Sequence, residues 1–545
     1  MIGEYAVKGL LAFCAVFLVG SALRVQTAGQ TPTAAQWQAD VRFLGTELPK
    51  RHRNAFHRGT AEDFNTAVNK LYDSVPNMTQ DEIVVGMMKI VAMVHDGHTN
   101  MVPRPYLKSG VFPVRLYQFT DGVYVVKAAP AYADLLGGKV VRIGNLSIED
   151  AMAAVAPVVA ADNEMGIRDF GPQFLSIPEV LSGLKIINDK QSLDVVLSKN
   201  GKEKTFTLHP EGAFQDIITP PAGWSDAAQG KDIPLYLTHR GSGTLWFEYL
   251  KDKQIVYVKQ DAVQNDPDKT LAELYKQVFD LIDANPVDKL VIDLRNNGGG
   301  NNGLNTPIII DMVRSKIDKR GHLFVITGRQ TFSAAQNFVN QIEKWTEAIF
   351  VGEPTADHVN MYGDNRPFTL PNSGLIVRAS TLWWQDLDPR DERKWKAPDI
   401  AAEMSFEDYR AGRDPAFQAV LDYKPGSTLS GIIDSALKGD TLGDFVQRYR
   451  AGRNDPKSKY VENENALNQF GYSLMAKKRN ADAVEVLRLN TEFYPNSANA
   501  FDSLGDAYQA VGNKEMAVKA YEKALSIDPN FPSSITALRR LKGAN

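Results

Sequence analysis

A serine between small residues and a glycine-rich turn are the parts of this sequence best suited to chemistry. Ser333 lies in the run Thr-Phe-Ser-Ala-Ala at 331–335, where a predicted strand gives way to a predicted helix. The turn at 296–300, Asn-Asn-Gly-Gly-Gly, follows the apolar run 289–294. A serine hydroxyl is a nucleophile, and backbone N–H groups that no side chain covers can bind an oxyanion. The two segments therefore predict acyl transfer.

The same two segments resemble the core of the tail-specific (C-terminal-processing) serine peptidases and of the tricorn protease. The family signatures are a strand ending in Asp-Leu-Arg-x-Asn-x-Gly-Gly and a later Thr-x-Ser-Ala-Ala, which stand here at 293–300 and 331–335. The resemblance covers about residues 34–425. It implies an enzyme that hydrolyses peptide bonds through an acyl-enzyme on Ser333, without a cofactor or a metal. The expected oxyanion donors are the backbone N–H groups of Gly299, Gly298 and Ala334.

Family members activate the serine with either a downstream lysine or an upstream histidine. The lysine position holds His358 here, at the end of Gly-Glu-Pro-Thr-Ala-Asp-His. The upstream histidine of the tricorn type corresponds to His98, which Thr99 follows. A neutral imidazole near pH 7 suits a general base. We therefore expect His98 to be the base, with His358 as an alternative base or a residue that lines the cleft.

The tricorn arrangement adds a glutamate late in the core and a serine just before the histidine. Glu392 stands six residues before a Pro-Asp pair, as the family glutamate does, although Trp395 replaces the family's glycine. Gly97 replaces the serine. The resemblance thus assigns Glu392 to the charge relay. The alternative is a solvated carboxylate in the charged run 388–396.

Two other functions remain open. A catalytically inactive protein on this fold could bind a small hydrophobic ligand or a peptide, as the retinoid-binding proteins of the eye resemble these peptidases. Gln336, where the family has glutamate, and Gly97 are consistent with that alternative. The presence of both Ser333 and His98 favours an enzyme. The third alternative is a scaffold that acts through its C-terminal repeats.

Charge and the N-terminus restrict partners and location. The 545 residues carry a formal net charge of -4 and no block of basic residues, so we expect no nucleic-acid partner. An apolar run at 9–20 follows Lys8 and is short for a membrane span. It predicts a signal peptide at 1–29, a periplasmic or secreted protein, and no stable membrane insertion after cleavage. An uncleaved anchor is the alternative.

The pattern of elements predicts an α/β multi-domain protein. Strands near 254–258, 290–294, 323–327 and 348–352 alternate with helices near 268–284, 305–317 and 333–345, which indicates mostly parallel pairing. The resemblance implies a crotonase-like or Clp-protease-like core. A period of 34 residues near the C-terminus fits tetratricopeptide repeats, which would dock a protein partner. The expected units are a helical region at 34–105, a loosely PDZ-like α+β domain at 110–212, the core at 235–425, and two repeats with a capping helix at 464–542.

Overall fold

The computed structural model describes residues 31–543, apart from 105, 229–232, 239–243, 386–387 and 440. The expected signal peptide at 1–29 lies outside these residues. No helix within the described ranges is long and apolar enough to cross a membrane.

Three helices form the N-terminal layer: α1 (Ala34–Arg51), α2 (Ala61–Ser74) and α3 (Gln80–Ala92). Each begins after a threonine whose hydroxyl accepts an N–H from the first turn, which satisfies a donor that the helix itself leaves free. Most residues of α3 are buried. Because α3 is fixed in the core, it also fixes the start of the loop 95–99 that carries His98.

An antiparallel sheet follows, with strand order β1-β2-β3-β5-β6 and two short strands beside it. Its hairpin between β5 and β6 turns at Asn200 and Gly201, both with positive φ, as the sequence pair predicts. Two helices, α5 and α6, lie between α4 and β5 in the chain. The strands are β1 (Val114–Phe119), β2 (Gly122–Ala128), β3 (Lys139–Ile143), β4 (Leu146–Ser147), β5 (Leu193–Lys199), β6 (Lys202–Leu208) and β7 (Ser225–Asp226). The helices are α4 (Ile148–Val155), α5 (Glu164–Phe174), α6 (Pro178–Gly183) and α7 (Phe214–Ile218).

The N-terminal helices and this sheet share one hydrophobic core. Leu44 and Val91 from the helices and Val125 and Leu197 from the strands belong to the same buried cluster. Residues 34–105 and 110–212 are therefore two layers around one core, where the sequence suggested two domains.

The catalytic-type core is a six-stranded sheet of order β15-β12-β11-β10-β9-β8 within the described residues. All pairs are parallel except β8 with β9. β10 lies beside β11, so the turns that follow these two strands meet at the carboxyl edge of the sheet. The strands are β8 (Leu245–Leu250), β9 (Ile255–Gln260), β10 (Lys289–Asp293), β11 (Leu323–Thr327), β12 (Ile349–Gly352) and β15 (Ile400–Ala401). The helices are α8 (Leu235–Thr238), α9 (Leu271–Ala284), α10 (Asn305–Arg314), α11 (Ala334–Trp345), α12 (Phe406–Arg410) and α13 (Pro415–Asp422).

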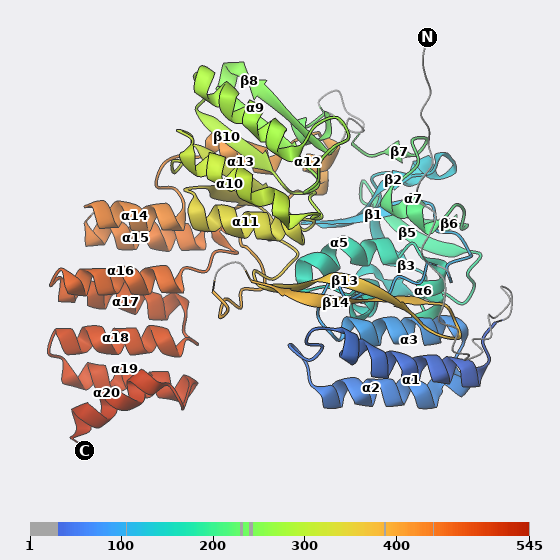
Figure 1. Ribbon diagram of the computed structural model, residues 1–545, viewed down its shortest axis with the longest axis horizontal. Helices are drawn as coiled ribbons and strands as arrows, with labels where there is room; N and C mark the ends of the chain where they lie inside the picture. Colours follow the sequence, from blue (N-terminus) through green and yellow to red (C-terminus); the bar gives the residue numbers. More distant parts are fainter. Residues whose placement is uncertain are drawn as a thin grey trace, which may run out of the picture.

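A long hairpin, β13 (Met361–Thr369) with β14 (Ile376–Trp384), leaves the core and runs along the N-terminal helices (Figure 1). At its tip the N–H groups of Asn372 and Ser373 donate to the Asp40 carboxylate of α1, at 2.9 and 2.7 Å. The sequence analysis did not predict this hairpin. It matters to the site because it joins the layer that carries His98 to the core that carries Ser333.

Helices alone make up the C-terminal part, which extends away from the core (Figure 1). Two antiparallel pairs and a final helix match the expected repeats and capping helix. A Cβ atom on Gly471 or Gly505 would lie 2.5 Å from Leu487 or Tyr521 of the paired helix, so the repeat glycines permit close packing. The helices are α14 (Leu429–Lys438), α15 (Leu442–Asn454), α16 (Glu464–Ala476), α17 (Asn480–Phe493), α18 (Ala498–Ala510), α19 (Lys514–Ile527) and α20 (Pro532–Lys542).

Candidate active site

Ser333 lies at the sharp turn between β11 and α11. Its backbone has φ 59° and ψ -128°, a conformation that residues other than glycine rarely adopt. Backbone strain of this kind costs about 1–3 kcal/mol and concentrates at active sites. A serine on a strained strand-to-helix turn has the geometry of a nucleophile elbow. The sequence located this serine, but gave no sign of its strained backbone.

The glycine turn after β10 packs directly against Ser333. Gly299 has φ 98°, and a Cβ atom there would lie 2.5 Å from the Ser333 Cβ and 2.9 Å from the Ala334 nitrogen. The Phe332 N–H also donates to the Asn297 carbonyl at 3.0 Å. Only glycine at position 299 lets the two turns approach this closely. The structure therefore brings the two sequence motifs together in one site.

The three expected oxyanion donors differ in whether their N–H groups are free. The Gly299 N–H donates to the Asn297 side-chain oxygen at 2.9 Å. Within the described residues, the N–H groups of Gly298 and Ala334 have no acceptor. Ala334 is the first residue of α11, where N–H groups lack partners within the helix and negative charge is favoured. Gly298 and Ala334 are thus the donors available to a ligand.

His98 comes from the loop after α3, and its ring stacks on Phe332, the residue before Ser333. The two ring centroids are 4.2 Å apart, with 23° between the ring planes. Burial lowers the pKa of His98, and the charges of Asp96 and Asp364 partly oppose this effect. The imidazole is therefore neutral near pH 7 and able to accept a proton. No hydrogen bond joins the Ser333 hydroxyl to His98 in the part of the chain that the structure describes.

Asp96 is the carboxylate beside His98, with 3.8 Å between its Oδ1 and the His98 Nδ1. It accepts the His98 backbone N–H at 2.9 Å and the Thr99 hydroxyl at 2.6 Å, and it contacts His52 Nε2 at 2.9 Å. Burial by itself would raise the pKa of Asp96, but these hydrogen bonds and the nearby His98 lower it on balance. The group is therefore an ionised carboxylate fixed at the base of the His98 loop. The sequence analysis gave Asp96 no role in catalysis.

His358 and Glu392 make other contacts. The His358 ring lies with Nε2 3.1 Å from the Asp162 carbonyl and Nδ1 3.3 Å from the Arg393 carbonyl. Burial, helped by the neighbouring Arg58 charge, lowers the pKa of His358 to about 4. Glu392 is exposed and has no hydrogen bond or ion pair among the described residues. His358 thus joins loops together, and no contact supports the expected relay through Glu392.

No group of three or more His, Cys, Asp or Glu side chains is arranged to hold a metal ion in the described ranges. Asp96, which stands between His95 and His98 in the sequence, already accepts hydrogen bonds from protein donors.

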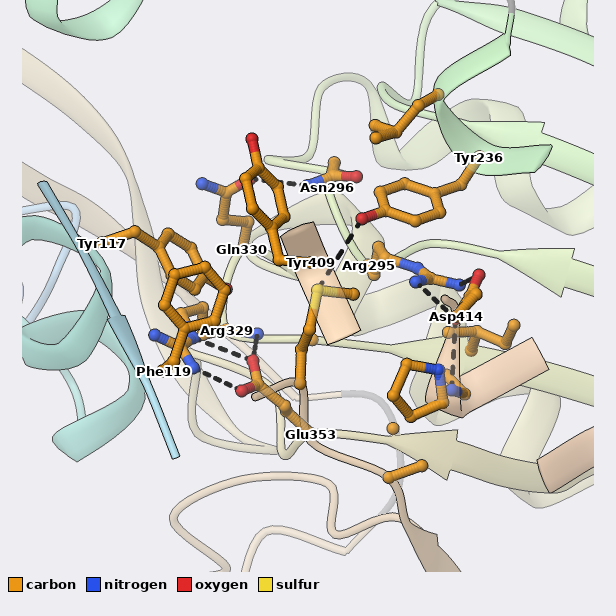
Figure 2. A pocket seen from close by; sticks show the side chains of 18 of the residues that line it. Tyr117, Phe119, Tyr236, Arg295, Asn296, Arg329, Gln330, Glu353, Tyr409 and Asp414 are labelled. Atoms are coloured by element: carbon orange, nitrogen blue, oxygen red, sulfur yellow. Dashed lines mark hydrogen bonds and ion pairs between the residues drawn. The ribbon is translucent and has the colours of Figure 1, made fainter. Parts of the chain in front are cut away.

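A cavity of about 360 Å³ lies beside the turns that follow β10 and β11, between the core sheet and the strand β1 (Figure 2). Two of its three arginines are paired with carboxylates, and the third, Arg115, donates to the Ile218 carbonyl at 3.2 Å. Arg295 donates two hydrogen bonds to Asp414, at 3.0 and 2.8 Å, and Arg329 donates to Glu353 at 2.8 Å. The charges of Arg295 and Arg329 are thus compensated within the protein, and the wall also offers aromatic surface. The aromatic residues of the wall are Tyr117, Phe119, Tyr236 and Tyr409.

Comparisons with known proteins agree with this architecture. Residues 503–531 match the family model of the tetratricopeptide repeat. A comparison with curated protein sequences gives no match. Among solved structures, mature CPAF complexed with lactacystin has a TM-score of 0.51 and 12% identity, and the match covers 75% of this chain and 99% of that chain. The photosystem II D1 C-terminal processing protease, at TM-score 0.33 and 15% identity, covers 70% of this chain and 98% of its own. The tricorn protease, at TM-score 0.34 and 17% identity, covers 71% of this chain and 36% of its own.

At 12% identity, the likeness to CPAF establishes a common fold, and the chemistry depends on this chain's own residues. The expected α/β multi-domain class, with a helical C-terminus that contains a tetratricopeptide repeat, is confirmed. The chain thus shares its fold with mature CPAF over about three quarters of its length, and a tetratricopeptide repeat lies near its C-terminus.

Proposed function

We propose that this protein is an exported serine peptidase, which hydrolyses peptide bonds through an acyl-enzyme on Ser333. One observation carries the proposal. A serine on a strained strand-to-helix turn packs against Gly299, while a buried neutral histidine stacks on the residue before that serine. A nucleophile and a base at one site, with free N–H donors beside them, are the parts that acyl transfer needs.

In the proposed reaction, Ser333 Oγ attacks the substrate carbonyl carbon while His98 takes the hydroxyl proton. The N–H groups of Gly298 and Ala334 support the resulting oxyanion. When the tetrahedral intermediate collapses, the C–N bond breaks and His98 gives its proton to the leaving amine. Water then attacks the acyl ester with His98 again as base, which releases the acid product and restores Ser333.

The imidazolium that forms during this reaction needs a negative partner. We assign that role to Asp96, because its carboxylate is ionised, fixed by several donors and 3.8 Å from His98 Nδ1. Glu392 stays a candidate from the resemblance alone. The absence of a hydrogen bond between Ser333 and His98 is compatible with catalysis, since such bonds are often long without substrate and shorten in the complex.

A fluorophosphonate probe that labels activated serines tests this proposal. We expect an adduct on Ser333, no adduct in Ser333→Ala, and about a 10²–10⁴-fold slower reaction in His98→Ala, the usual contribution of a general base. His322→Ala is the matched control, because His322 is half exposed and precedes β11 at the opposite end of that strand from Ser333. Loss of labelling in His358→Ala alone would move the role of base to His358.

The same missing hydrogen bond between Ser333 and His98 is what favours the alternative of a binding protein on this fold. Wild-type protein that fails to react with the probe, yet binds an apolar ligand or a peptide with measurable affinity, would support that alternative.

Location and partners complete the proposal. We infer export to the periplasm or the medium from the N-terminal run, and a peptide or protein as substrate. The tetratricopeptide repeats would dock a protein partner. Cell fractionation with N-terminal sequencing of the mature chain tests export. A cytoplasmic protein with an intact N-terminus would contradict it.

A further inference from the structure

Two carboxyl groups lie between the loop that carries His98 and the turn that carries Ser333. Asp162 Oδ2 accepts the Gly97 N–H at 2.7 Å. Asp357 Oδ2 accepts the Ser333 N–H at 2.5 Å. Each carboxyl group also acts on the pKa of the other, so the two groups interact directly. The two carboxyl groups therefore connect the base loop, through the Gly97 N–H, with the nucleophile turn, through the Ser333 N–H.

This contact requires a proton, because two ionised carboxylates have no donor between them. The structure indicates where the proton resides. Asp357 is completely buried, and its Oδ1 has no hydrogen-bond partner within the described residues. A proton on this oxygen, donated to Asp162, satisfies an atom that would otherwise be a buried acceptor without a donor.

The surroundings favour one negative charge over two. Asp96, which is ionised, repels further charge on both members of the pair, and Arg58 is the cation that acts on Asp162. His358 faces the pair only through the Asp162 carbonyl, and its lowered pKa leaves it neutral. Burial is the main cause that raises the pKa of both groups. Asp162 is partly exposed, so the proton can exchange with water.

We propose that Asp162 and Asp357 share one proton, and that this proton holds the His98 loop against the Ser333 turn as a positioning element of the active site. The proposal rests on the peptidase function proposed above. Neither residue touches the reacting atoms through its side chain. Each acts through a backbone N–H, on Gly97 or on Ser333.

The proposal also accounts for Gly97, which stands where the tricorn pattern has serine. A Cβ atom at position 97 would lie 3.0 Å from Asp162 Oδ2 and 3.0 Å from the Phe332 ring. Such a contact is tighter than nearly all real Cβ contacts, so a larger residue would push the Asp162 carboxyl group away from the loop. The glycine lets the carboxyl group approach the loop backbone.

The pair predicts a loss of reactivity in alkaline solution. In alkaline solution the pair loses its shared proton, and the repulsion among Asp96, Asp162 and Asp357 separates the loop from the turn. A neutral His98 alone predicts a reaction rate that stays constant above its own pKa. Asp357→Asn should remove the alkaline loss, because the amide donates to Asp162, accepts from Ser333 and cannot ionise.

The first experiment measures the rate of fluorophosphonate labelling between pH 6 and 10 for wild type, Asp357→Asn and Asp357→Ala. In the alkaline part of this range we expect the wild-type rate to fall about tenfold for each pH unit, as for loss of one essential proton. The Asn variant should retain the neutral rate and show no fall. The Ala variant, which lacks both hydrogen bonds, should be at least tenfold slower at every pH. An identical alkaline fall in wild type and Asp357→Asn would overturn the proposal.

A second measurement is independent of peptidase chemistry. Infrared spectra are recorded at pH 7 for Ser333→Ala and for the double variant that also carries Asp357→Asn. Their difference should show the carbonyl stretch of one protonated carboxyl group, which is present only in the single variant. Absence of this band, with Ser333 still labelled in the wild type, overturns the shared proton and leaves the peptidase proposal intact. A band without labelling of any form overturns the proposed function, and the positioning role with it.

Discussion

Replacing Gly299 by alanine would place a methyl group against the nucleophile. The new Cβ would lie 2.5 Å from the Ser333 Cβ, 2.8 Å from the Phe332 carbonyl oxygen and 2.9 Å from the Ala334 nitrogen. Ordinary contact begins at 3.4 Å, so the glycine turn must move away from Ser333 by about 1 Å. A displacement of about 1 Å in a catalytic geometry can cost about 10²-fold in rate.

The variant also has a backbone cost, since alanine is strained at φ 98°. Backbone strain of this kind amounts to about 1–3 kcal/mol. Gly374→Ala is the matched control, because Gly374 also has positive φ, at 72°, but a Cβ atom there would meet nothing within 4 Å. The control should lose stability and keep its reactivity, whereas Gly299→Ala should lose both.

The assay is the rate of fluorophosphonate labelling at Ser333, with the melting temperature measured on the same samples. We expect Gly299→Ala to react about 10²-fold more slowly than wild type while the protein stays folded at the assay temperature. Wild-type labelling by a folded Gly299→Ala protein would refute the reasoning, because the turn would then have moved without consequence for the nucleophile.

Other predictions concern stability. The Thr331 hydroxyl donates to the Leu294 carbonyl at 2.8 Å and accepts the Gly328 N–H at 3.0 Å. Thr331→Val removes both bonds and should lower the free energy of unfolding in denaturant by about 1–3 kcal/mol, while Thr331→Ser should lower it less. Arg329→Met leaves the Glu353 carboxylate buried without its partner and should cost about 3–5 kcal/mol; a melting temperature equal to the wild type's would contradict this. Burial alone would raise the pKa of Glu353, but Arg329 lowers it to about 2. The pair therefore stabilises the fold above about pH 4.5, and this contribution is lost as the pH falls towards 2. Acid unfolding of the wild type, compared with that of Glu353→Gln, measures the contribution.

Local patterns in the sequence predicted the core well. The strand at 323–327 has the predicted bounds, and the helix predicted at 333–345 begins one residue later, at Ala334. These segments are predictable because parallel strands buried on both faces are continuously apolar, and because glycine and small residues are needed where turns approach closely. The tetratricopeptide helices were predictable for a similar reason, since a glycine at a fixed period permits each helix pair to pack.

The sequence by itself determined the fold class, the nucleophile candidate and the repeats, because these depend on residues close together in the chain. Only the tertiary structure decided the surroundings of Ser333. Its backbone is strained. The stacking of His98 on Phe332 and the Asp162–Asp357 interaction join segments that lie up to 234 residues apart in the numbering. Contacts of this kind leave no periodic pattern, since each depends on one side chain and on how distant layers pack. For the same reason, the sequence could not indicate which carboxylate lies beside His98. The fold places Asp96 there and leaves Glu392 exposed to solvent.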